Sequence, residues 1–447
     1  MRLKLKNKIV TSHYTVEDAR KIKETTTNKF PAFDVGELDA LIPGYQMWDN
    51  WEVRLVNGRA ASVQGHKVLI ALVRPREADF SAGERIAFMY SKDGVHYKIG
   101  GLLFEGHQLY EGVREWSGST ILREDGKLQT FYTVSYGSEV EGVWQTVQRF
   151  ATAIQSVSVD EEGVMHVSAP EYHSLLGGAC EPDGVLYETP AQASIREKAL
   201  PTVHSRVVGS DQTENNCFRD PCFYRNTKTG KNYLIFEGNT GSGRHPAGVV
   251  AAEYVGKKGG FAPTTDMLKA NGCIGVIELV DKEYTFGIFN EPLLTANLVT
   301  DEIERINAFD TKDGFYLFCA GHGNKNALNS ENPDLINRDY LLGFHASSFG
   351  APLTPINGSG VVVQQKSFGD AYAGQASNQQ YVYSWILVPD EVSDKTGVYD
   401  CLSYANYSRL EDGTIAAVMG IAPTISVELS KTKSRIVGRK YDIKPFK

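Results

Sequence analysis

The 447-residue sequence lacks the marks of membrane and nucleic-acid-binding proteins. It contains no apolar run of roughly 18 residues, the length that spans a bilayer. The first ten residues, MRLKLKNKIV, are basic but lack the apolar centre of a signal peptide. Lys and Arg total 46 against 54 Asp and Glu, so the net charge of −8 disfavours a phosphate-binding surface. We therefore expect neither a membrane nor a nucleic-acid partner.

Several catalytic signatures are also missing. The ten histidines form no HExxH or His-x-His cluster, and EGNTGSGRHPAG lacks the GK[ST] ending of a phosphate loop. No G-x-S-x-G serine lies between a strand and a helix. The six cysteines show no CxxC pair or zinc spacing, so we expect reduced, packed thiols and no metal held by cysteine; they are Cys180, Cys217, Cys222, Cys273, Cys319 and Cys401.

Long amphipathic helices are scarce, whereas 43 glycines and 22 tyrosines favour strands and tight turns. Asp-Gly pairs between β-rich runs predict hairpins, because both residues tolerate positive φ. Five stretches follow this pattern: RIAFMYSKDGVHYKIGG, STILREDGKLQTFYTVSYG, PCFYRNTKTGKNYLIFEGN, INAFDTKDGFYLFCAG and YANYSRLEDGTIAAVMG, of which the third has a Lys-Thr-Gly turn instead. An all-β fold follows, and a propeller, a sandwich and a barrel remain open.

The first part of the chain differs from the rest. TVEDARKIKETT predicts a short helix capped by Thr15, within a polar lead-in segment. We expect an N-terminal arm over residues 1–35 and one catalytic domain over residues 36–447.

Three short motifs are candidates for chemistry. In QMWDNWEVR, Asp49 stands between Trp48 and Trp51, an arrangement typical of sugar sites but also of a turn between core tryptophans. In NNCFRDPCFY, Arg219 and Asp220 precede a proline that prevents a helix, and a structural turn is the alternative.

The third motif is DEIER, residues 301–305. As a helix it would be a solvated face of ion pairs. The β-like flanks favour a strand, in which Glu302 and Glu304 share one face while Asp301 and Arg305 take the other. Two adjacent carboxylates repel, which raises the pKa of one and suits it to act as a general acid.

WDNW, FRDP and DEIER, in this order, resemble the levansucrase-type fructosyltransferases of glycoside hydrolase family 68. REWSG, FEGNTG, ANLVTDEIERIN and PINGSGVVV also look like this family, and the match runs from about Tyr45 to APTISVEL near the C-terminus. The resemblance implies an all-β, five-bladed β-propeller around an acidic pocket. It implies that Asp49 is the nucleophile, Asp220 the transition-state stabiliser and Glu304 the general acid/base.

The resemblance also implies a set of sugar-binding side chains. Ser117 is expected to hydrogen-bond the nucleophile, and His322 falls where the family varies between Arg and His, a position associated with acceptor binding. Tyr383 aligns with a tyrosine near the acid/base. The full set is Trp48, Trp116, Ser117, Arg219, Glu237, Glu302, Arg305, His322 and Tyr383.

The resemblance carries expectations for partners and location as well. Sucrose and acceptor sugars are the expected partners, and no cofactor is expected. Glu214 stands where some members have a calcium-binding aspartate, which leaves Asp301 as a possible ligand of a structural calcium ion. Many members have a secretory leader and others are exported without one, so we expect an extracellular protein, with the cytoplasm as the alternative.

Three functions remain open at this point. A transferase that builds levan or fructo-oligosaccharides from sucrose and a sucrose hydrolase would use the same catalytic residues. They differ in how well an acceptor sugar is held beside Glu304. A carbohydrate-binding propeller without catalysis is the third.

Overall fold

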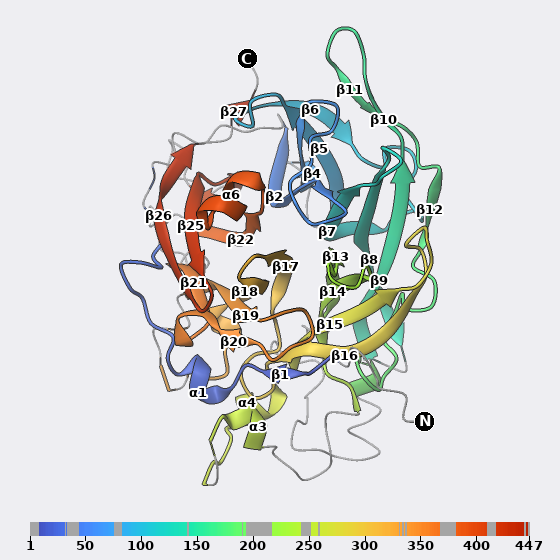
Figure 1. Cartoon of the computed structure of the whole chain (residues 1–447). Coiled ribbons are helices and arrows are strands. Elements are labelled where there is room, and N and C mark those ends of the chain that lie inside the picture. The colour runs from blue at the N-terminus through green and yellow to red at the C-terminus, as the bar shows by residue number, and fades with distance from the viewer. Residues whose placement is uncertain are drawn as a thin grey trace, which may run out of the picture.

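The computed structural model describes residues 9–31, 33, 44–75, 83–140, 143–189, 191–193, 217–242, 252–257, 260–329, 331–332, 335, 338–366, 381–408, 417–441 and 444–445. Five separate sheets are arranged around a common centre, so the fold is a five-bladed β-propeller (Figure 1). The described helices are short: α1 (Val16–Ala19), α3 (Ala252–Val255), α4 (Thr265–Lys269) and α6 (Glu391–Thr396). None of them is long and apolar enough to cross a membrane.

The first two blades follow each other along the chain. Blade 1 contains β2 (Tyr45–Glu52), β4 (Lys67–Pro75), β5 (Arg85–Ser91), β6 (His96–Leu102) and β27 (Lys444–Pro445). Blade 2 contains β3 (Arg54–Leu55), β7 (Arg114–Leu122), β8 (Leu128–Val140), β9 (Val143–Gln155) and β12 (Tyr172–Leu175). A separate pair, β10 (Val157–Val159) and β11 (Met165–Val167), projects from the rim.

The other three blades complete the circle. Blade 3 contains β13 (Phe218–Arg225), β14 (Asn232–Asn239), β15 (Gly272–Leu279), β16 (Gly287–Thr295) and β1 (Ser12–His13). Blade 4 contains β17 (Glu304–Thr311), β18 (Gly314–His322), β19 (Arg338–Ala346), β20 (Thr354–Pro355) and β21 (Val361–Lys366). Blade 5 contains β22 (Tyr381–Val388), β23 (Val398–Ser408), β24 (Ala417–Ile421), β25 (Thr424–Ser430) and β26 (Lys433–Tyr441).

The antiparallel strand pairs of the five predicted hairpins are confirmed, one in each blade, and the Asp-Gly turn of the fifth lies outside the described residues. The antiparallel pairs are β5–β6, β7–β8, β13–β14, β17–β18 and β23–β24. The blade count was not readable from the hairpins alone, because their spacing along the chain is irregular.

Each interface between neighbouring blades holds its own apolar core. The core between blades 4 and 5 includes Phe318 and Trp385, and the core between blades 5 and 1 includes Met47 and Leu402. Three further clusters fill the interfaces of blades 1 and 2, 2 and 3, and 3 and 4. A middle strand is therefore buried on both faces, which explains continuous apolar runs such as VLIALV in β4.

The N-terminal segment packs against the propeller. Thr15 caps α1 as predicted, and Asp18 completes a reciprocal capping box with it. The helix is a single turn that ends at Ala19, well short of the predicted segment. β1 pairs in parallel with the end of β16. Tyr14 and Phe30 are buried in cores between blades. The division at residue 35 stays a prediction.

The first long strand of each blade lines the axis. These strands, β2, β7, β13, β17 and β22, contact one another in a closed ring. WDNW lies within β2, REWSG and FRDP open β7 and β13, the last two residues of DEIER open β17, and Tyr383 lies near the start of β22. Motifs that lie more than 300 residues apart in the chain thus meet at one end of the axis.

Candidate active site

A β-bulge interrupts every one of the five axial strands near its amino-terminal end. In each case one extra residue of the axial strand is inserted opposite the second strand of the blade, which bends the strand and turns side chains toward the axis. The register shifts fall between Met47 and Asn50, Trp116 and Gly118, Arg219 and Cys222, Glu304 and Asn307, and Tyr383 and Ile386.

Three bulge residues adopt left-handed backbone conformations although none is glycine. They are Asp220 (φ 58°), Arg305 (φ 57°) and Ser384 (φ 62°). Such conformations cost about 1–3 kcal/mol each and persist only where the surroundings hold them. Here the strand pairing on both sides of each bulge does so, and part of the strained backbone thus lies around the axis.

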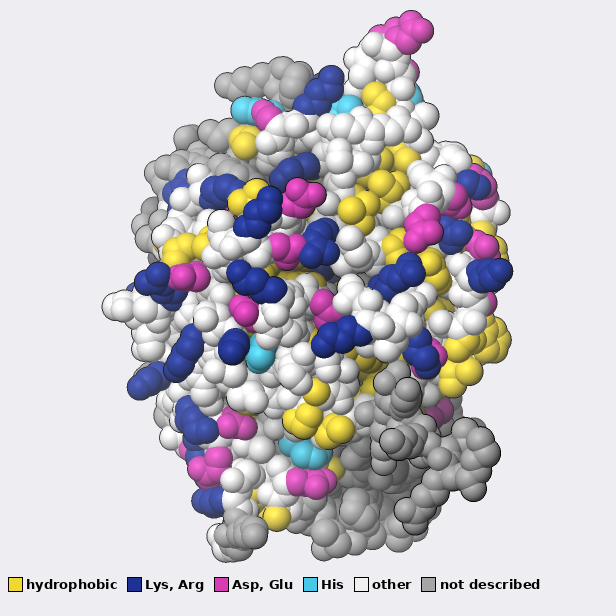
Figure 2. Space-filling view, in the orientation of Figure 1, with side chains coloured by type: hydrophobic (Ala, Val, Ile, Leu, Met, Phe, Trp, Pro, Cys, Tyr) yellow, Lys and Arg dark blue, Asp and Glu magenta, His cyan; other side chains and the backbone are white. Residues whose placement is uncertain are grey.

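A cavity of about 290 Å³ opens between these bulges. It is lined by Trp48, Asp49, Leu72, Arg74, Glu84, Trp116, Ser117, Arg219, Asp220, Glu304, His322, Tyr383 and Tyr404. Figure 2 shows acidic, basic and histidine side chains gathered near the middle of this face of the molecule. The volume lies at the lower end of the range of about 300–1,000 Å³ typical of small-molecule pockets.

Nine of the twelve side chains predicted for the site line this cavity. The other three, Glu237, Glu302 and Arg305, lie behind its wall, where they are between 0% and 5% exposed. All twelve lie in one connected group of contacts around the cavity.

Asp49 lies in the β2 bulge, and its side chain is 17% exposed. Ser117 donates a hydrogen bond of 2.5 Å from its Oγ to Asp49 Oδ2. Arg305 Nε lies 3.8 Å from Asp49 Oδ1. Asp49 therefore has one hydrogen-bond donor and one cation beside it while the carboxylate still faces the cavity.

Arg305 is held from three other blades. Its Nε donates to Ser384 Oγ at 2.7 Å, and an Nη donates to the carbonyl oxygen of Asn50 at 2.8 Å. Its backbone N–H donates to Asp220 Oδ2 at 2.8 Å. Arg305 thus joins blades 1, 3 and 5 to blade 4, because the positive φ at this residue sends side chain and N–H in different directions.

Asp220 is 5% exposed at the cavity wall. Burial raises the pKa of this carboxyl group, and the guanidinium groups of Arg305 and Arg219 oppose the rise. The backbone N–H of Asp220 donates to Thr133 Oγ1 at 3.1 Å, which fixes the bulge to blade 2.

Glu304 is the first residue of β17 and receives hydrogen bonds on both oxygens. Arg219 Nη2 donates to Oε1 at 2.5 Å, and the Tyr383 hydroxyl donates to Oε2 at 2.5 Å. Burial raises the pKa of Glu304 to about 7, with Arg219 opposing the rise and Glu302 adding to it. A carboxyl group with this pKa can both give and accept a proton near neutrality.

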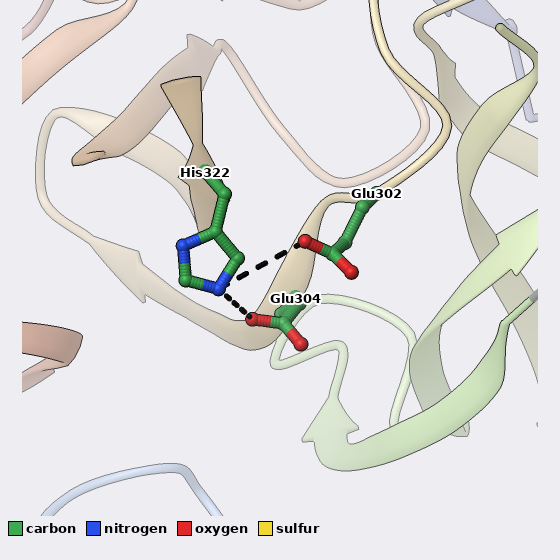
Figure 3. A group of neighbouring side chains, drawn as sticks. All are labelled: Glu302, Glu304 and His322. Atoms are coloured by element: carbon green, nitrogen blue, oxygen red, sulfur yellow. Dashed lines mark ion pairs between the residues drawn. The ribbon is translucent and has the colours of Figure 1, made fainter. Parts of the chain in front are cut away.

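The predicted neighbourhood of Glu302 and Glu304 is present, but a regular strand does not produce it. Residues 301–303 precede β17, and the helical alternative is wrong. Figure 3 shows both carboxylates turned toward one nitrogen of the His322 ring. His322 Nε2 lies 3.6 Å from Glu304 Oε2 and 3.9 Å from Glu302 Oε1.

Arg219 is the cation at the centre of the three glutamates. Its Nε donates to Glu237 Oε2 at 2.7 Å, and Nη2 lies 3.3 Å from Glu302 Oε2 as well as bonding Glu304. Its guanidinium carbon lies 5.9 Å from the Trp116 ring centroid. Arg219 therefore compensates several buried charges at once, and burial raises the pKa of Glu237 well above its usual range.

Two groups of residues come into question as metal sites, and the structure tests one of them. Glu302, Glu304 and His322 offer ligand-type atoms within 4.8 Å of one another. Arg219 already supplies positive charge to both glutamates, so this group is an ion-pair network by its chemistry. Around Asp301, the carbonyl oxygen accepts a hydrogen bond from Asn239 Nδ2 at 3.1 Å. Glu214 lies outside the described residues, so the possible calcium site stays untested.

Sequence reasoning missed four lining residues, Leu72, Arg74, Glu84 and Tyr404. Glu84 Oε2 accepts from Trp116 Nε1 at 3.1 Å, and the Arg74 guanidinium lies 5.9 Å from the Trp48 ring centroid. For Glu84 and Arg74, the only sequence signal is a charged residue near the end of an apolar strand, which is common on any protein surface.

Comparisons with known proteins agree with this geometry. A family model described as levansucrase/invertase, glycoside hydrolase family 68, matches residues 4–442. A levansucrase of Bacillus subtilis is 29% identical over 461 residues, covering 95% of this chain and 88% of the relative. The structure of a B. megaterium levansucrase superposes with a TM-score of 0.77 at 25% identity and 97% coverage of each chain. An inulosucrase from Halalkalicoccus jeotgali, bound to kestose, gives a TM-score of 0.73 at 26% identity and 98% coverage of each.

Proposed function

We propose that this chain, which belongs to the levansucrase/invertase family of glycoside hydrolase family 68, is a retaining fructosyltransferase that acts on sucrose. It would release glucose and pass the fructosyl group to an acceptor through a covalent fructosyl-enzyme. The observation that carries the proposal is the pairing of an accessible Asp49 with a Glu304 of pKa about 7 on one sugar-sized cavity.

In the first step, protonated Glu304 donates its proton to the oxygen between glucose C1 and fructose C2. Asp49 attacks C2 from the opposite side, so the C–O bond to glucose breaks as the bond to Asp49 forms. Retaining enzymes place the two carboxyl groups about 5–5.5 Å apart for this purpose. The hydrogen bond from Ser117 orients the Asp49 carboxylate for attack.

In the second step the roles reverse. Glu304, now a carboxylate, accepts the proton of an incoming hydroxyl group, and that oxygen attacks C2 and displaces Asp49. Arg219 and Tyr383 hydrogen-bond the Glu304 oxygens and favour its charged form between the two steps.

Asp220 would stabilise the transition state between these carboxyl groups. Positive charge develops at fructose C2 and its ring oxygen, and a carboxylate that binds ring hydroxyls gains strength as that charge grows. The Arg305 N–H that bonds Asp220 Oδ2 holds the carboxylate in place before substrate arrives.

The proposal is tested by incubating the protein with concentrated sucrose and measuring free glucose and free fructose. A transferase releases glucose in excess over fructose, and NMR of the products identifies the linkage. Equal amounts of the two sugars would mean that the protein hydrolyses sucrose, with water as the acceptor. If the intact protein releases no glucose, the remaining interpretation is a carbohydrate-binding propeller without catalysis. If the intact protein releases glucose and Asp49→Ala does not, catalysis is assigned to this site.

A further inference from the structure

The His322 ring has a carboxylate at each nitrogen. Nδ1 lies 3.1 Å from Asp339 Oδ1, while Nε2 lies 3.6 Å from Glu304 Oε2 and 3.9 Å from Glu302 Oε1. A neutral imidazole carries one N–H and one lone pair, and while Glu304 is ionised the lone pair would face a carboxylate in either tautomer. Only the imidazolium, with an N–H at both nitrogens, suits both sides of the ring.

Asp339 is placed to support that charge. It lies on β19 opposite His322 and is 1% exposed. Its Oδ1 also accepts the Gly323 N–H at 3.2 Å, and Oδ2 is buried with no hydrogen-bond partner among the described residues. In that part of the chain, His322 is the one cation within ion-pair distance of Asp339. A buried carboxylate without its cation is costly, so the pair stabilises both charges.

The ring cannot easily turn away from Glu304. It stacks on Tyr383 with centroids 4.0 Å apart and planes 13° from parallel. Tyr383 in turn donates its hydroxyl hydrogen to Glu304 Oε2 at 2.5 Å. A side chain at residue 323 would overlap the carbonyl oxygens of Leu335 and Arg338, so a glycine is needed where the chain leaves His322.

We propose that Asp339 is a positioning residue that keeps His322 doubly protonated and its Nε2–H directed at Glu304. The inference rests on the proposed function, in which Glu304 gives a proton and takes one back. An imidazolium at this place stabilises the Glu304 carboxylate that exists between the two steps. Asp339 lines no part of the cavity and acts only through the ring.

The electrostatics of the ring agree with this geometry. Burial lowers the pKa of His322, but Asp339 and then Glu302 and Glu304 outweigh it and raise the pKa to about 10. The charge on His322 in turn lowers the pKa of Glu304. Among the described residues, the other ionisable groups that interact with these two are Arg219, Glu302, Asp220, Glu237, Cys217 and Tyr383.

The test is Asp339→Asn, which keeps an acceptor oxygen for His322 and Gly323 but removes the charge. His322 should then be neutral at neutral pH, and the pKa of Glu304 should rise. The alkaline limb of kcat/KM for sucrose, which reports loss of the Glu304 proton, should move up by about one pH unit. Asp310→Asn is the matched control, because Asp310 bonds Tyr224 and Thr227 outside the cavity lining.

His322→Gln supplies an independent arm, because this side chain is 27% exposed and the glutamine amide can still donate a hydrogen bond to Asp339. It should move the alkaline limb in the same direction, and Asp339→Asn should add nothing further in its background. NMR titration should show the His322 resonance, assigned by its absence in His322→Gln, protonated through neutral pH in the parent and neutral there in Asp339→Asn.

The outcomes separate this inference from the proposed function. An unmodified protein that releases no glucose from sucrose contradicts the proposed function, while the NMR titration still tests the Asp339–His322 pair. If both Asp339→Asn and His322→Gln turn over sucrose and the alkaline limb stays in place in both, this inference is overturned while the proposed function stands. A His322 resonance that titrates identically in the parent and in Asp339→Asn overturns it too.

Discussion

Replacing Glu304 by glutamine should remove activity and, above neutral pH, make the protein more stable. Glutamine has nearly the same shape, and its oxygen can accept from Arg219 while its amide nitrogen donates to the Tyr383 hydroxyl oxygen, but it cannot ionise. The parent must hold a charge that its buried surroundings disfavour once the pH exceeds the pKa of Glu304. The active site is therefore expected to reduce the stability of the fold.

The magnitude follows from linkage. The pKa of Glu304 is raised from 4.5 to about 7 in the folded protein. A carboxyl group with a raised folded pKa favours folding below its unfolded pKa, and this contribution is lost as pH rises through the folded value. The stability of the variant relative to the parent should therefore grow between about pH 4.5 and pH 7, by roughly 3 kcal/mol in all, at about 1.4 kcal/mol per pKa unit.

The measurement is thermal unfolding of parent and variant between about pH 5 and about pH 8. At about 2.1 cal/mol/K per residue, the unfolding entropy of 447 residues converts roughly 3 kcal/mol into about 3 °C. The Tm of Glu304→Gln minus that of the parent should rise by this amount across the range. Glu124→Gln is the control, because the Glu124 side chain is 83% exposed.

A Tm difference that stays flat with pH would refute the reasoning. It would mean that Glu304 titrates alike in the folded and unfolded chain, as an exposed surface glutamate does. DEIER would then be an ordinary group of ion pairs despite its place in the cavity wall. Sucrose turnover that persisted in Glu304→Gln with an unchanged bell-shaped pH profile would lead to the same conclusion.

Three further substitutions probe the site and its support. Ser117→Ala removes the hydrogen bond to Asp49 and should lower kcat/KM for sucrose by about 10- to 100-fold, the worth of a bond to a charged group; an unchanged value would deny Ser117 that role. Asp220→Asn should lower kcat by about 100- to 1,000-fold with little change in KM. A rise in KM alone would mean that Asp220 binds sucrose equally well in the ground state and the transition state. Gly118→Ala would drive its new methyl group into the carbonyl oxygen of Phe131, so Tm should fall by several degrees; a Tm equal to that of the parent would mean that the bulge tolerates a shift.

Much of the fold followed from local sequence. Asp-Gly turns between β-rich runs predicted the hairpins correctly, because turn conformation and strand propensity depend on a few neighbouring residues. Scarcity of helical periodicity predicted the all-β class for the same reason. The helix after Thr15 was placed correctly at its start, since the capping box is local, but its end was wrong because the following residues pack against the blades instead.

The site was predictable only in part. WDNW, FRDP and DEIER named Asp49, Asp220 and Glu304, but the expected strand period did not explain how Glu302 and Glu304 come together. A bulge and a left-handed Arg305 arrange them, and such strained backbone persists only because neighbouring blades hold it.

The amino-acid sequence by itself thus determined the hairpins, the all-β class and the three motifs that carry the carboxylates, because these depend on short-range chemistry. Only the tertiary structure decided that there are five blades, that five bulges surround one cavity, and which side chains contact Asp49, Asp220 and Glu304. Asp339 illustrates the difference, since nothing in NRDYLLG indicates a catalytic neighbour. Pairing of β18 with β19 places it against His322, and that contact exists only in the folded chain.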